Sequence, residues 1–294
     1  MIVARLPWER CVVAVHALRL LVGAYAVALT SAAGAHEFWI LPDRFTAAPG
    51  SEVAFALRVG AGWPGEAFPR QPQRIVRFDL VDAEGVRPIE GGAGAEPAGI
   101  ARVRAAGVAI AVYRSNPASI ALEPALFERY LHEEGLEAIV ALRAARGQSA
   151  LPARERYSRA AKSIVAIGAG PAAPRGFDRA LGLTLELIPE RLPSRLRPGD
   201  VLGVRLLHLG RPLAGALVRA LPQSAAQAPV SARSDAAGRL RLRLDTPGVW
   251  LLNAVHMVEA APESGADWES IWSTLTFEIP ADPGRRFRAP RPPS

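Results

Sequence analysis

Cysteine is almost absent from the 294-residue sequence, in which Cys11 is the only one. Its place near the start excludes internal disulfides, thiolate metal sites and cysteine nucleophiles from the rest of the chain. Lysine is equally scarce, since Lys162 is the only one among 35 basic residues. The net charge of +7 comes from arginines that are spread singly, with no basic patch interleaved with aromatics. We therefore expect no nucleic-acid partner.

The common catalytic motifs are also missing. The sequence has no G-x-S-x-G motif, no P-loop and no G-x-G-x-x-G before a helix. Ser158 and Lys162 are four residues apart, one too many for an S-x-x-K pair. Glu133 and Glu134 are adjacent on an expected helix and point apart, so they do not form the acid pair of a glycosidase. We expect a binding protein without catalytic residues.

The N-terminal segment has the features of a signal peptide. Arg5 and Arg10 precede a mostly apolar run over residues 18–29, and Ala33 and Ala35 give the A-x-A pattern of a cleavage site. The run is shorter than the ~20 residues that span a membrane. We predict a signal peptide over residues 1–35 and a periplasmic or secreted mature chain that begins at His36. The alternative is an uncleaved segment, which would be the only membrane contact.

The rest of the chain has the pattern of short strands. Its 26 prolines and 26 glycines separate segments with apolar residues at every second position, such as residues 53–59, 75–81, 108–112 and 240–244. This predicts a mainly all-β protein with two β-sandwich domains, immunoglobulin-like or prealbumin-like, over residues 36–168 and 177–280. The proline- and glycine-rich residues 168–176 are the expected linker, and residues 281–294 are an expected disordered tail.

One segment of the first domain has a helical period instead. Leu126, Tyr130 and Leu131, followed by Ile139 and Leu142, have three- and four-residue spacing, and a glycine divides the run. We predict a helical insertion of two short helices, over residues 124–134 and 136–145. The strand that ends this domain is expected over residues 163–167.

Several motifs together resemble one known family. "AHEFWI", "YRSNP", "FERYLHEEGL", "RERYSRAAKSIV", "GRPLAGALV", "SDAAGR" and "ADWESIWSTLTF" are similar to a bacterial periplasmic family of unknown function, which is often labelled a nickel- or cobalt-uptake transporter component. The resemblance extends over nearly all of residues 36–278. It implies a role in metal uptake but does not itself define a site.

His36 and His256 are the candidate metal ligands. Once Ala35 is released, the amine and Nδ1 of His36 can close a chelate ring on Cu²⁺ or Ni²⁺, which accept nitrogen ligands in tetragonal geometry. His256 is the expected further ligand because it ends the strand "VWLLNAVHM" and precedes an acid-rich loop. The alternatives are that His36 merely follows a cleavage site and that His256 is a hydrogen-bonded core histidine. We expect His132 on a solvated helix face and His208 facing solvent.

These residues lead to a first hypothesis of function and to an alternative. The first is a periplasmic metal-handling protein that binds nickel, cobalt or copper through His36 and serves an envelope metal transporter. The alternative is a metal-free β-sandwich interaction module at the cell envelope, which would use the loop that carries Trp268 and Trp272. We expect these two rings to pack in the core rather than to stack on a sugar. A copper enzyme built on a terminal histidine would need a second imidazole near His36.

Overall fold

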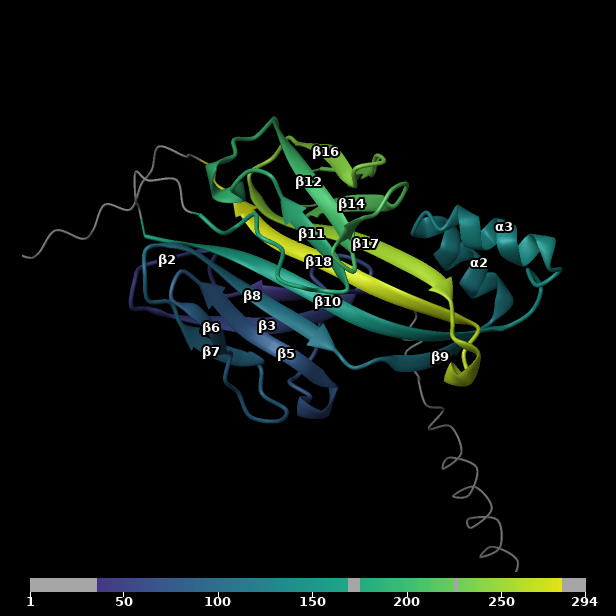
Figure 1. Cartoon of the computed structure of the whole chain (residues 1–294). Coiled ribbons are helices and arrows are strands. Elements are labelled where there is room, and N and C mark those ends of the chain that lie inside the picture. Colours follow the sequence, from purple (N-terminus) through teal and green to yellow (C-terminus); the bar gives the residue numbers. More distant parts are fainter. Residues whose placement is uncertain (1–35, 169–174, 225–226, 282–294) are drawn as a thin grey trace, which may run out of the picture. The chain divides into compact units, whose positions relative to one another are not determined.

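The fold is built from β-sheets (Figure 1). The computed structural model describes residues 36–168, 175–224 and 227–281. Their strands form a central sheet of ten strands and two outer sheets of four strands each. This confirms the predicted mainly all-β sandwich class. The predicted signal peptide, most of the predicted linker and residues 282–294 of the predicted tail lie outside the described residues.

The central sheet combines strands from both halves of the chain. β10 and β18 run parallel and pair from Glu155 with Trp268 to Ser163 with Thr276. The two predicted domains share this sheet, and the division of the chain into two domains stays a prediction. In spatial order the main path is β15 (Val230–Arg233), β14 (Leu217–Pro222), β17 (Gly248–Glu259), β18 (Trp268–Ile279), β10 (Ala153–Ile167), β8 (Gly107–Ser115), β5 (Ile75–Asp82) and β6 (Gly85–Pro88). Two further strands, β2 (Thr46–Ala47) and β9 (Ala118–Leu122), also pair with β10.

The two outer sheets cover opposite faces of the central sheet. Because successive side chains of a strand point to opposite faces, Ala109 and Ala111 of β8 pack with the first outer sheet, whereas Val108 and Ile110 pack with the second. The first outer sheet contains β1 (Glu37–Pro42), β3 (Glu52–Gly60), β4 (Glu66–Ala67) and β7 (Gly99–Arg102). The second outer sheet contains β11 (Leu185–Pro189), β12 (Asp200–His208), β13 (Arg211–Pro212) and β16 (Arg239–Leu244).

The alternating segments of the sequence form strands as expected. In β3, Val53, Phe55 and Leu57 are buried while their neighbours are partly or fully exposed. The leucines of β16 are buried in the same way, and its three arginines are exposed. Burial of one face of each strand therefore sets the orientation of the outer sheets on the central one.

The helical insertion is also confirmed. α2 (Pro124–Glu133) and α3 (Glu137–Ala145) are joined at Gly135, whose φ of +67° suits a residue without a Cβ. Three 3-10 turns complete the described helices, at Pro72–Arg74, Pro193–Arg195 and Pro262–Ser264. Within the described ranges, no helix has the length and apolar character needed to cross a membrane.

The start of β10 corrects the sequence prediction. The strand was expected over residues 163–167, but it begins at Ala153. The polar first half is extended because Glu155 is buried and accepts hydrogen bonds from the hydroxyls of Tyr130 on α2 and Ser270 on β18. Burial of this carboxyl raises its pKa, against the lowering effect of these hydrogen bonds. Its partners come from distant segments, so no local pattern indicates the strand.

Candidate functional site

His36 directly precedes β1, which is held by hydrogen bonds to β3 on one side and to β18 on the other. Phe38, Trp39 and Ile40 are fully buried, and β1 pairs with β3 along its whole length. The hydroxyls of Thr274 and Thr276 on β18 donate to the carbonyl oxygens of Phe38 and Ile40, each at 2.7 Å. His36 itself is partly exposed. The buried Phe38 and Trp39 therefore anchor the chain and leave His36 near the surface.

Two buried carboxyl groups share one arginine beside this strand. Arg219 Nη1 lies 2.8 Å from Glu134 Oε1 and 3.5 Å from Glu37 Oε1. Asn253 Nδ2 donates to Glu134 Oε2 at 2.9 Å, but Asn253 Oδ1 has no partner among the described residues. We call these four residues the acid cluster. With both carboxyls ionised, the cluster carries one more negative charge than positive charge.

At least one carboxyl of the acid cluster, that of Glu134, has a pKa close to neutral pH. Burial raises the pKa of Glu134 to about 7, and the attraction of Arg219 offsets only part of that rise. Burial likewise raises the pKa of Glu37, while its backbone hydrogen bond, Arg219 and His36 lower it. No local sequence pattern indicates this arrangement, because the four residues lie on β1, directly after α2, on β14 and on β17.

His256 contacts a different histidine from the one expected. Its ring lies 4.4 Å from the ring of His208, centroid to centroid, with an angle of 58° between the planes. His208 ends β12 in the second outer sheet, and both residues are partly buried. His208 therefore packs on His256 instead of facing solvent freely. His132 is exposed on α2, as predicted.

The hydrogen bond expected for a core histidine is not found at His256. Within the described ranges, neither the His256 ring nor the His208 ring forms a hydrogen bond or an ion pair, and the two rings touch each other. Burial, and then the neighbouring His208, lowers the pKa of His256 to about 4, and burial lowers the pKa of His208. Both imidazoles are therefore neutral at pH 7.

The fold does not bring His36 and His256 together. On β17, Asn253 points to the acid cluster on the face covered by the first outer sheet. His256 is three residues further on and points to the other face, as do Leu252 and Ala254, which pack with the second outer sheet. No group of three or more histidine, cysteine or acidic side chains in the described part of the chain is arranged to hold a metal ion. His256 therefore does not supply the second imidazole that a copper enzyme at His36 would need.

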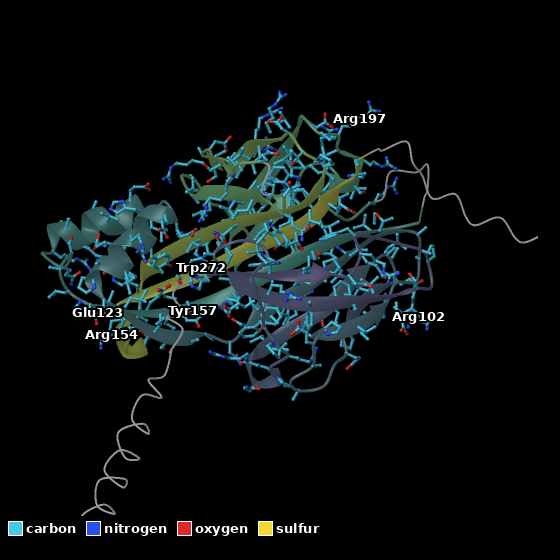
Figure 2. All side chains as sticks on the ribbon, turned by 180° about the vertical axis from the view of Figure 1, so that it is seen from behind. Arg102, Glu123, Arg154, Tyr157, Arg197 and Trp272 are labelled. Atoms are coloured by element: carbon cyan, nitrogen blue, oxygen red, sulfur yellow. The ribbon has the colours of Figure 1, made fainter. Side chains whose placement is uncertain are left out.

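Trp268 and Trp272 are core residues. Each is 2% exposed, and Trp272, labelled in Figure 2, stacks on Tyr130 of α2 with centroids 5.4 Å apart and planes 20° apart. Trp268 lies against Phe127 of the same helix. This confirms the packing interpretation, and neither ring is available to stack on a ligand.

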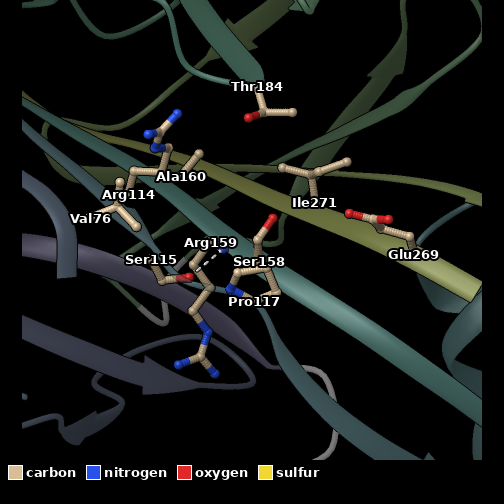
Figure 3. Close-up of a pocket in the computed structure, with 10 residues that line it drawn as sticks. All are labelled: Val76, Arg114, Ser115, Pro117, Ser158, Arg159, Ala160, Thr184, Glu269 and Ile271. Carbon is tan, nitrogen blue, oxygen red and sulfur yellow. Dashed lines mark hydrogen bonds between the residues drawn. The ribbon is translucent and has the colours of Figure 1, made fainter. Parts of the chain in front are cut away.

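An open cleft lies at the edge of the core between the central sheet and the second outer sheet (Figure 3). Its walls include Arg114, Ser158, Thr184 and Glu269, and none of the predicted site residues lines it. The backbone of Arg159 donates to Ser115 Oγ at 3.0 Å, while its guanidinium lies over the Phe38 ring, away from these polar walls. No histidine lines the cleft, although Ile271 on its wall is the cross-strand partner of His256.

The fold and these contacts define an all-β protein of stacked sheets with a partly exposed histidine before an anchored strand. Residues 33–258 match the family described as "Domain of unknown function (DUF4198)", and the chain belongs to this family. No curated protein matches it significantly. Among solved structures it matches the "D0-D1 domain of Intimin", with 11% identity, 82% of this chain and 97% of that chain covered, and a TM-score of 0.21. That score is too low to support an argument about the fold.

Proposed function

We propose that the mature protein is a periplasmic or secreted protein that binds a divalent transition-metal ion, nickel, cobalt or copper, through an N-terminal His36. The observation that supports this most directly is the anchoring of β1. A two-nitrogen chelate needs its backbone held still, and the burial of Phe38, Trp39 and Ile40 fixes the chain from the residue after His36 onward. The proposed activity is binding and transfer of the ion, without catalysis.

The chemistry depends on cleavage after Ala35. A free amine and Nδ1 of the same histidine form one chelate ring, whereas an internal histidine offers its ring alone. When both of its carboxyls are ionised, the acid cluster carries a net negative charge and attracts cations, and its Glu37 is covalently next to His36. The remaining coordination positions would be filled by water, which suits an ion that is passed to an envelope metal transporter.

The test compares the mature chain that begins at His36 with a chain that has one extra alanine before it. Both are titrated by calorimetry near neutral pH with the three proposed metals, Ni²⁺, Co²⁺ and Cu²⁺, and with Zn²⁺ for comparison. The added alanine keeps the imidazole but removes the amine from the ring, so affinity should fall by at least ~10-fold. Copper should bind more tightly than zinc. Acid should release the metal, because protons compete with it for the amine and the imidazole.

His132→Gln is the matched control, because His132 is exposed on α2 and should not alter binding. Equal affinity of the mature and alanine-extended chains would refute a terminal chelate. A mature chain that binds none of the three metals would favour the alternative, a metal-free interaction module at the envelope. Because Trp268 and Trp272 are buried, such a module would use a surface other than these rings.

A further inference from the structure

A pair of histidine rings lies on the other side of the central sheet from the acid cluster. His208 ends β12, and His256 is near the end of β17, so the pair joins the second outer sheet to the central sheet. The two residues are 48 positions apart in the sequence. Only the stacking of the sheets brings their rings to 4.4 Å.

The rings have unused binding capacity. Each neutral imidazole has one nitrogen with a lone pair and one N–H group. Most buried polar side-chain atoms have a hydrogen-bond partner, yet no described residue donates to or accepts from either of these two partly buried rings. Both side chains are only partly buried, so an ion can reach them from solvent.

The separation of the rings suits neighbouring positions around one ion. A metal–nitrogen bond is about 2.0 Å long and the ring centre lies about 1.1 Å behind the nitrogen, which puts each centre about 3.2 Å from the metal. Two rings at a right angle around the ion then have centres about 4.5 Å apart, and two at a tetrahedral angle about 5.2 Å apart. The observed 4.4 Å is close to the right-angle value.

We propose that His208 and His256 together form a two-imidazole site for Cu²⁺ or Ni²⁺, separate from the N-terminus. The right-angle arrangement is that of square-planar ions and disfavours zinc, which is almost always tetrahedral in structural sites. No third side chain in the described part of the chain completes a ligand group, so the other positions belong to water. The site is therefore open and exchanges its ion readily, and it does not depend on processing at Ala35.

The test uses the alanine-extended chain, in which the proposed terminal chelate is disabled. It is titrated with Cu²⁺ and Ni²⁺ by calorimetry, as are its His208→Gln, His256→Gln and double variants, with His132→Gln as control. The extended chain should retain one bound ion. Each single variant should weaken its binding by at least ~10-fold, and the double variant should add little, since one lost ring already opens the chelate.

The outcomes for the two sites are separable. Loss of one ion on alanine extension and of the other on His256→Gln would support both sites. No bound ion in the extended chain, or unchanged binding in both histidine variants, would overturn this proposal without touching the terminal chelate. If a histidine variant does not fold, the site is tested instead by NMR on the alanine-extended chain without substitutions. Substoichiometric Cu²⁺ should broaden the ring proton resonances of both His208 and His256, and sharp resonances would refute the site.

Discussion

Replacing Glu134 by Gln should stabilise the mature protein in alkaline solution. Glu134 is buried and shares Arg219 with Glu37. Burial raises its pKa from the ordinary 4.5 to about 7, so its charged form costs folding free energy. Gln has almost the same shape and cannot ionise. Its amide can also donate to Asn253 Oδ1, which has no partner among the described residues.

The size and pH range of the effect follow from the pKa. Between pH 4.5 and 7 the unfolded chain releases the Glu134 proton while the folded chain keeps it, so this group lowers stability progressively as the pH rises. Above pH 7 the loss is complete. At about 1.4 kcal/mol for each pH unit, it amounts to about 3 kcal/mol. Glu134→Gln should recover up to this amount at pH 8.5 and almost nothing at pH 4.5.

Thermal unfolding of the metal-free mature chain at the two pH values measures the effect. For a chain of this size, about 3 kcal/mol corresponds to a rise in Tm of about 6–12 °C. Glu123→Gln is the control, because the Glu123 side chain is exposed and its replacement should change Tm little at either pH. An equal Tm for Glu134→Gln and the parent at pH 8.5 would refute the reasoning, as would the same gain at both pH values.

Two further variants test the packing of the sheets. Lys162→Met should lower the free energy of unfolding, measured with denaturant, by about 3–5 kcal/mol, because the buried Glu186 carboxylate would lose its cation. In the parent protein this carboxylate is 2.9 Å from Lys162 Nζ and 2% exposed. Adding Glu186→Gln should recover part of the loss, and a Lys162→Met variant of unchanged stability would contradict the importance of this pair. Gly65→Ala should cost about 2 kcal/mol or more, because Gly65 has a φ of +63° and a Cβ there would overlap the Trp39 ring. The fluorescence of Trp39 should shift as well, and an unchanged spectrum with unchanged stability would exclude this close contact.

Local patterns were sufficient for most strands and for the helices. β16 alternates leucine with arginine, and β3 alternates apolar residues with small or polar ones, so each shows its buried face in the sequence. The helical insertion is visible because its apolar spacing changes from two to three and four.

Features that depend on distant partners were not visible. The first half of β10 is polar, and it becomes a strand only because Tyr130 and Ser270 satisfy Glu155. The acid cluster joins Glu37 to Glu134, which are 97 residues apart, through Arg219 of β14. His256 lies on the same face of β17 as Leu252 and Ala254, but its neighbouring side chain depends on which strand of the second outer sheet lies above it. Sequence spacing contains no information on that stacking.

The geometry of β17 makes the two proposed metal sites independent. Asn253 and His256 are three residues apart, about 10 Å along an extended strand, and they point to opposite faces of the central sheet. Perturbations more than 7–10 Å apart with no shared partner add with little coupling. Glu134→Gln, next to the terminal chelate, should therefore leave copper binding at His208 and His256 unchanged. Conversely, His256→Gln should leave the pH dependence of the Glu134→Gln gain unchanged. Strong coupling between them would mean that the central sheet rearranges when either face is altered.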